Sequence, residues 1–94
     1  MKELHITKVL ELSTAHISEE TNGLIEQDVL GIVAYEKAEY GWLLLVPQDD
    51  YEEETRSLPD DLKAIFDLAQ EHDCVWVMLD RDGYMYDSLP VFDW

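Results

Sequence analysis

The chain has 94 residues, of which 22 are Asp or Glu and six are Lys or Arg, giving a formal net charge of -16 at pH 7. A surface of this charge repels nucleic acid and anionic membranes and attracts cationic surfaces, so direct binding to DNA or RNA is excluded as a main function. The apolar content of 47% is ordinary for a folded protein, and the length predicts one small acidic domain over residues 1–94. The single cysteine, Cys74, leaves no internal disulfide, and residues 1–12 lack a continuous apolar run. We therefore expect a cytoplasmic protein with no signal peptide and no membrane contact.

Residues 4–12 mix β-branched and apolar residues with polar ones, which predicts a first strand. Ser18, followed by Glu19 and Glu20, predicts the N-cap of a short helix that ends near Gln27. Residues 31–35 and 42–46 then predict the two strands of a hairpin. The second strand has no polar residue, which predicts that both of its faces are covered.

The segment 48–56 holds five acidic residues, which predicts an exposed loop or a frayed turn. Ser57 and Asp60 resemble a capping box, and apolar residues follow at the spacing of an amphipathic helix that runs to about His72, namely Leu62, Ile65, Phe66 and Ala69. The apolar run 74–79 predicts a strand joined to 42–46 by a right-handed, parallel crossover. Residues 80–83 predict a tight turn, and 84–86 a last antiparallel strand.

This order of elements is strand, helix, strand, strand, helix, strand, strand. It predicts an α+β fold, a two-layer sandwich in which a mixed sheet carries two helices on one face. A ferredoxin-like arrangement is one topology of this kind, and the sequence leaves the strand order open.

Several short segments together resemble one family. They are Ser13-Thr14-Ala15-His16, Glu39-Tyr40-Gly41-Trp42, Leu58-Pro59-Asp60-Asp61-Leu62, Leu79-Asp80-Arg81-Asp82-Gly83 and Leu89-Pro90-Val91-Phe92-Asp93-Trp94. The chain resembles a family of short acidic bacterial proteins of unknown function that accompany plasmids, prophages and other mobile elements. The resemblance implies no catalytic residue and no cofactor, and it does not extend to the acidic residues between positions 49 and 54.

The acidic composition suggests the main hypothesis for function. B-DNA carries one negative charge per about 1.7 Å of its axis, and 16 net charges on a body of this size approach the charge density of a short duplex. We therefore predict a non-enzymatic protein that binds a basic protein surface, including that of a nucleic-acid-binding protein, as a DNA mimic or anti-defence factor. The residues predicted to bind this partner are Asp49, Asp50, Glu52, Glu53, Glu54, Asp60 and Asp61. The competing interpretation is that these acids only keep the domain soluble.

Catalysis is a second hypothesis. Asp80 and Asp82 flank the predicted turn and present hard oxygen ligands two residues apart, as a small metal-assisted enzyme requires. The alternative is a turn stabilised by aspartate side chains. His16 lies between a strand and a helix start, where packing or capping competes with a catalytic role. Cys74 is expected to be a small buried residue rather than a reactive thiol.

Aromatic residues give a third hypothesis. Trp42 and Trp76 fall within apolar strands and are predicted to lie in the core. The C-terminal aromatic residues either anchor a partner or a second copy, as an interaction or dimerisation module, or Phe92 and Trp94 fold back to close the edge of the sheet. These residues are Tyr84, Tyr86, Phe92 and Trp94.

Overall fold

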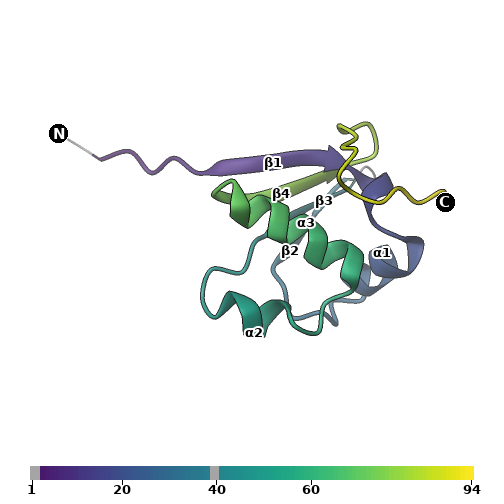
Figure 1. Ribbon diagram of the computed structural model, residues 1–94, viewed down its shortest axis with the longest axis horizontal. Helices are drawn as coiled ribbons and strands as arrows, with labels where there is room; N and C mark the ends of the chain where they lie inside the picture. The colour runs from purple at the N-terminus through teal and green to yellow at the C-terminus, as the bar shows by residue number, and fades with distance from the viewer. Residues whose placement is uncertain (1–2, 39–40) are drawn as a thin grey trace.

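A four-stranded sheet carries its helices on one face in the computed structural model, which describes residues 3–38 and 41–94 (Figure 1). The strands are β1 (Lys8–Ser13), β2 (Ala34–Lys37), β3 (Gly41–Leu45) and β4 (Cys74–Asp80). The helices are α1 (Glu19–Glu26), α2 (Tyr51–Thr55) and α3 (Asp60–Glu71), preceded by a 3-10 turn, η1 (Thr14–His16). The predicted two-layer α+β sandwich is confirmed, with three α-helices where two were expected.

The strand order in the sheet is β1-β4-β3-β2. β1 and β4 are parallel, whereas β4 with β3 and β3 with β2 are antiparallel, so the predicted mixed sheet is confirmed. The ferredoxin-like arrangement is not found, because it places the first strand inside the sheet and β1 lies at the edge.

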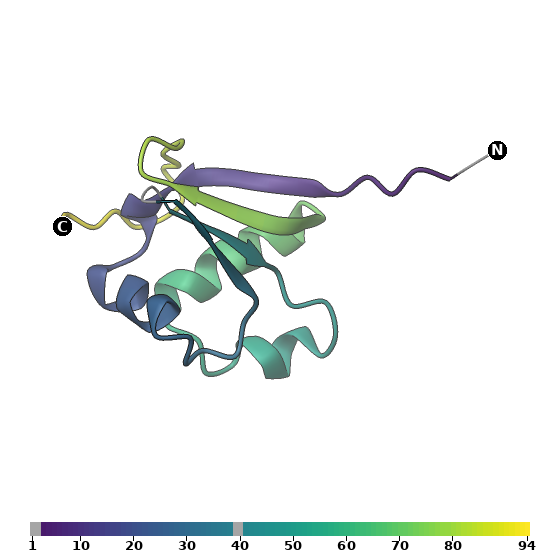
Figure 2. The same cartoon turned by 180° about the vertical axis from the view of Figure 1, so that it is seen from behind.

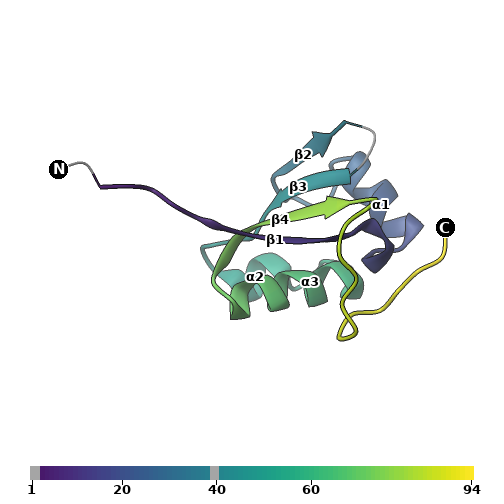
Figure 3. The same cartoon turned by 90° about the horizontal axis from the view of Figure 1, so that it is seen from above.

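The predicted parallel crossover between β3 and β4 is wrong, because the two strands pair antiparallel, with Leu45 opposite Trp76. β3 therefore ends beside the start of β4. Residues 46–59, with α2, carry the chain along the helical layer, and α3 brings it back to the start of β4 (Figures 1 and 3). Because α3 returns the chain to the sheet at the end of β3, β4 runs antiparallel to β3 and not parallel to it. This direction was missed because residues 48–56 were predicted to be a loop or a frayed turn.

Two further strand predictions differ from the structure. Residues 84–86 form no strand and follow the predicted turn, in which the Gly83 amide donates to the Asp80 carbonyl at 2.9 Å. β1 begins at Lys8, so residues 3–7 extend beyond the sheet, as Figure 1 shows at the purple end of the chain. A strand segment without a neighbour makes no ladder hydrogen bonds, and this end of β1 outruns its partner β4.

Helix starts are formed by two different residue patterns. The predicted N-cap Ser18 is confirmed, since its hydroxyl accepts a hydrogen bond from the Thr21 amide at 3.1 Å. The capping box proposed for α3 is wrong, because Pro59 occupies the N-cap position and makes no side-chain cap. Its fixed φ of -56° prepares the chain for the first turn instead.

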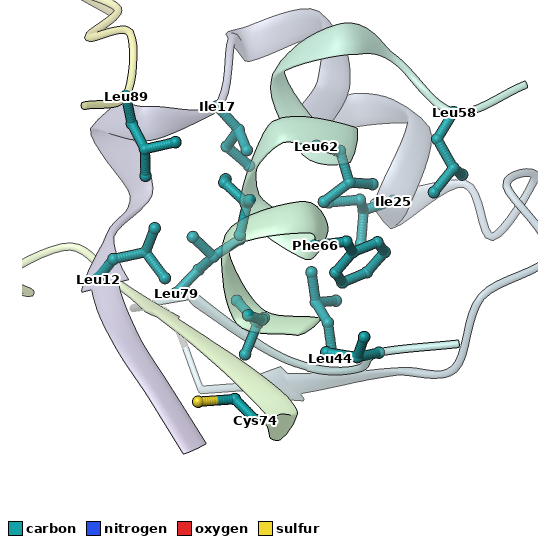
Figure 4. Close-up of a cluster of buried hydrophobic side chains, with 14 of the residues drawn as sticks. Leu12, Ile17, Ile25, Leu44, Leu58, Leu62, Phe66, Cys74, Leu79 and Leu89 are labelled. Carbon is teal, nitrogen blue, oxygen red and sulfur yellow. The ribbon is translucent and has the colours of Figure 1, made fainter. Parts of the chain in front are cut away.

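The core lies between α3 and one face of the sheet. The predicted apolar face of α3 is confirmed, since Leu62, Ile65, Phe66 and Ala69 are all buried. Figure 4 shows Phe66 and Leu62 pointing toward Ile25 of α1 and Leu44 of β3. Cys74 is buried at the start of β4, as predicted.

No helix within residues 3–38 and 41–94 lies on the other face of the sheet, called the open face below, and the view from behind shows β2 and β3 in front of α3 (Figure 2). Leu44 is 0% exposed on the helical side, whereas Tyr35, opposite Leu43 on the open side, is 58% exposed. The prediction that both faces of residues 42–46 are covered is therefore wrong. Trp42 packs against the core, but Trp76 lies on the open face beside Tyr35, with ring centroids 6.2 Å apart. The open face carries the apolar side chains of Val9, Tyr35, Leu43, Leu45, Trp76 and Met78, together with the charged side chains of Glu11, Lys37 and Asp80.

Candidate functional site

Acidic residues gather on the helical side of the sheet. Residues 19–28 and 49–73, called the helix layer below, contain α1, α2 and α3 and hold 14 of the 22 acidic residues. Only two cationic residues, Arg56 and Lys63, lie in the same ranges. Thirteen of the 14 acidic residues are exposed. The strands hold three acidic residues, Glu11, Glu36 and Asp80, so the negative charge is concentrated on one side of the sheet.

The acidic segment that was predicted to be a loop or a frayed turn contains the helix α2. Tyr51 and Thr55, four residues apart, lie on one face of this helix and are buried. The Tyr51 hydroxyl donates to Asp67 of α3 at 2.7 Å. Burial, with this hydrogen bond and the Asp67 charge, raises the pKa of Tyr51 above its usual value. The helix is thereby fixed to α3 with its exposed residues, Glu52–Glu54, facing solvent.

Asp61 differs from the other residues of the predicted partner-binding set. It is only 9% exposed, and its two carboxylate oxygens accept from the Ser18 amide and the Thr21 hydroxyl, each at 2.8 Å. The carboxylate therefore joins α3 to the start of α1 and is not available to a partner. The set that remains on the surface is Asp49, Asp50, Glu52, Glu53, Glu54 and Asp60.

The two cations of the helix layer are already paired. Arg56 contacts Glu53 at 2.7 Å and Lys63 contacts Asp67 at 3.0 Å. Both are exposed pairs within a helix or its end, which contribute little to stability. The pairs neutralise two of the acidic side chains and leave the rest of this surface negative.

The turn at Asp80 does not fit a metal site. One Asp80 carboxylate oxygen contacts Lys37 Nζ at 2.7 Å and the other accepts from the Asp82 amide at 2.8 Å. The Lys37 hydrogen bond, followed by the Asp82 amide, holds the pKa of Asp80 below its usual range. Over residues 3–38 and 41–94, no group of three or more His, Cys, Asp or Glu side chains is placed to hold a metal ion. The geometry matches the alternative hypothesis, a turn that is stabilised by aspartate side chains.

A cavity that sequence reasoning missed lies at one edge of the sheet, where β1 and β4 end and β3 begins. It has a volume of about 490 Å³. Its walls include Ser13 at the end of β1, Arg81 after β4 and Trp42 near the start of β3. α1 contributes Glu26, and the C-terminal residues Phe92–Trp94 contribute the remaining side.

The C-terminal residues are held in place by a run of hydrogen bonds along β1 and η1. The Ser13 amide donates to the Tyr84 carbonyl at 2.8 Å, and the Phe92 amide donates to the Ala15 carbonyl at 2.7 Å. Trp94 Nε1 donates to the Ile17 carbonyl at 2.8 Å. The alternative in which Phe92 and Trp94 fold back over the edge of the sheet is therefore confirmed, although Trp94 remains 51% exposed.

His16 is a packing residue in this arrangement. It is completely buried, and its Nε2 accepts from the Tyr86 amide at 3.0 Å. Its Nδ1 lies 2.8 Å from the Pro90 carbonyl, which can only accept, so the proton is on Nδ1. Both ring nitrogens are used to hold the C-terminal segment, which leaves neither free to act as a base.

Most of the segments that carried the family resemblance meet at this cavity. Four of the five contribute lining residues: 13–16, 39–42, 79–83 and 89–94. Two of these segments also hold glycines at close backbone approaches. A Cβ on Gly41 would lie 1.7 Å from the Leu79 carbonyl oxygen, and one on Gly83 would lie 2.5 Å from the Leu12 carbonyl oxygen. The segments themselves are visible in the sequence. That they meet at one cavity can be recognised only when the strand order is known.

Residues 9–94 match the model of the C-terminal domain of a family of unknown function, DUF5983, and the chain belongs to that family. No curated protein and no solved structure matches the chain. No helix within residues 3–38 and 41–94 has the length and apolar character needed to cross a membrane.

Proposed function

We propose that the helix layer binds a basic protein surface in the cytoplasm, without catalysing a reaction. The observation that supports this proposal is the separation of charge. The helix layer holds 14 acidic residues and only two cationic residues, both already paired, whereas the strands hold three acidic residues and two lysines. An unevenly charged body turns its negative side toward a cationic partner and raises the rate of association.

The three helices of the helix layer are joined to one another by hydrogen bonds. Asp61 joins α3 to α1, and the hydrogen bond from Tyr51 to Asp67 joins α2 to α3. The helices that carry the acids therefore keep fixed relative positions, and a partner need not order this backbone on binding, which reduces the entropic cost of association.

DNA mimicry by a protein of a mobile element is the narrower form of this proposal. The two shorter dimensions of the molecule are 29 and 26 Å. A duplex 29 Å long carries about 17 phosphates, close to the formal net charge of -16. A basic groove that accepts DNA, in a restriction enzyme, a CRISPR complex or a repressor, has the complementary charge, which would make the protein an anti-defence factor.

The test compares two variants that remove the same number and kinds of charge. The helix-layer variant changes Asp49 and Asp50 to Asn, and Glu52 and Glu54 to Gln. The control variant makes the same changes at acids outside the helix layer, namely Asp82, Asp87, Glu3 and Glu11, all of them exposed.

A partner captured from a bacterial lysate by the wild-type protein is identified and purified, and its affinity for all three proteins is measured. We expect the helix-layer variant to lose at least tenfold in affinity and the control variant to change by less than threefold, as rough limits for four charges in contact with a partner. Double-stranded DNA should compete for a partner that is recognised by mimicry. Equal affinity of the two variants would refute the proposal, and a partner that DNA does not displace would refute only its narrower form.

A further inference from the structure

The cavity at the edge of the sheet has a lining of unusual chemistry for a pocket of its size. Among the described residues, three aromatic side chains, Trp42, Phe92 and Trp94, line it together with three carboxylates. The carboxylates are Glu26 from α1, Glu36 from β2 and Asp93. At about 490 Å³ the cavity falls within the range of small-molecule sites.

The two indoles are fixed in place by their N–H groups. Trp42 Nε1 donates to Asn22 Oδ1 at 2.9 Å, and Trp94 Nε1 donates to the Ile17 carbonyl at 2.8 Å. Because each indole has only one polar hydrogen, the rings have no donor left for a ligand. What they still offer is the π system, whose negative face attracts cations and, among the aromatic side chains, does so most strongly in tryptophan.

The carboxylates of the cavity are not neutralised by the described residues. Glu26, Glu36 and Asp93 take part in none of the ion pairs found within residues 3–38 and 41–94. Among the lining residues that the structure describes, Arg81 is the cationic one, and it is not without a partner. The lining is therefore net negative, within a chain whose total charge is -16, and this combination favours a cation over an anion.

We propose that this cavity binds an organic cation, a guanidinium or alkylammonium group, between the aromatic rings and the carboxylates. The rings contact the alkyl part and the face of the cationic group, and the carboxylates accept its hydrogen bonds. A divalent metal ion is not the proposed ligand, because within the residues that the structure describes no three carboxylates are grouped closely enough to hold one. Glu26 belongs to both the cavity and the helix layer, but the proposal does not require that the helix layer bind a basic protein.

The probe is agmatine, which carries a guanidinium on an alkyl chain, and the signals are the indole N–H resonances of the ¹⁵N-labelled protein. We expect saturable shifts of Trp42 and Trp94 at millimolar agmatine and no shift of Trp76. Trp76 serves as the internal control because it lies on the open face, in contact with Tyr35. N-butylurea, a neutral molecule of similar shape, and inorganic phosphate should produce no saturable shift.

Matched variants test the two kinds of lining residue. Trp94→Leu and Glu36→Gln should each weaken agmatine binding by about threefold to tenfold, as expected for the loss of one cation–π contact or one nearby charge. The controls Trp76→Leu and Glu11→Gln, at positions outside the cavity, should leave it unchanged. Thermal melting of each variant shows whether it remains folded.

The source of the cationic group is distinguished by a second ligand, an acetylated and amidated Gly-Arg-Gly peptide. Tighter binding of the peptide than of agmatine assigns the cavity to an arginine side chain of a protein, and the reverse assigns it to a free amine. The proposal is overturned if agmatine gives no saturable shift, if N-butylurea binds as well as agmatine, or if phosphate is the ligand that shifts Trp42 and Trp94.

Discussion

The two sides of the sheet differ in both charge and cover. On the helical side, three helices bury the core and expose 13 acidic residues. On the open face, apolar side chains such as Tyr35 and Val9 are exposed, and the ion pair between Lys37 and Asp80 is locally neutral. Most of the acidic residues thus lie on the side that covers the core, whereas the mainly apolar open face carries Glu11 beside this ion pair. Net charge alone therefore does not describe the surface of this protein, because the helical side is acidic and the open face is mainly apolar.

The largest expected effect compares neighbouring leucines of β3. Leu44 is completely buried on the helical side, and Leu43 lies on the open face. Leu44→Ala should lower the free energy of unfolding by about 2–5 kcal/mol, because it leaves a cavity, and Leu43→Ala by about 1 kcal/mol. Urea denaturation measures both values. Equal losses would break the comparison, since they would mean that another surface covers the open face in solution.

Asp60 and Asp61 are adjacent in the sequence and test which acidic residues of the helix layer stabilise the fold. Asp61→Ala leaves the Ser18 amide and the Thr21 hydroxyl without their acceptor, which should cost about 2–4 kcal/mol of stability. Asp60→Ala removes an exposed charge from the first turn of α3 and should cost less than about 1 kcal/mol. Chemical denaturation distinguishes them. An Asp61→Ala protein as stable as Asp60→Ala would contradict the structural role assigned to Asp61.

Self-repulsion in the helix layer gives a smaller effect of opposite sign. The helix-layer variant removes four charges from a crowded negative surface and should gain up to about 1 kcal/mol of stability at low salt, a gain that screening removes at high salt. The control variant should gain less. Melting temperatures at low and high ionic strength provide the measurement. A loss of stability in the helix-layer variant at low salt would show that its acids are not repelling one another.

The smallest effect concerns the ion pair on the sheet. Because Lys37 lowers the pKa of Asp80 in the folded protein, the ionised carboxylate stabilises the fold above its unfolded pKa. That contribution is lost as the pH falls through the lowered pKa. Lys37→Gln should raise the pKa of Asp80 toward its usual value and reduce the acid dependence of stability. NMR titration of the Asp80 carboxyl group follows the change, and an unaltered pKa would show that Lys37 is not its main partner.

Sequence patterns predicted the elements with strong periodicity or capping. Leu62, Ile65 and Phe66 repeat at helical spacing, and Ser18 precedes two glutamates, so the start of α1 and the buried face of α3 were both predicted. The fold class followed from the order of these elements. Local chemistry is sufficient for such features because they depend on residues close in sequence.

The strand order and both sites depended on contacts that the sequence does not display. α2 was missed because two buried residues, Tyr51 and Thr55, stand among acids and its stability comes from packing on α3. Without α2, the direction of β4 could not be predicted. The cavity in turn requires four distant segments to meet at one edge of the sheet, and Asp61 became structural only because Ser18 and Thr21 lie beside it.

The most direct test of the central claim is the salt dependence of partner affinity in the wild type and the matched variants. The account predicts that the wild-type affinity falls steeply with ionic strength, that the helix-layer variant binds weakly with a shallower dependence, and that the control variant follows the wild type. Identical salt dependence for the two variants would contradict the claim that charge gathered on the helical side, rather than total charge, selects the partner.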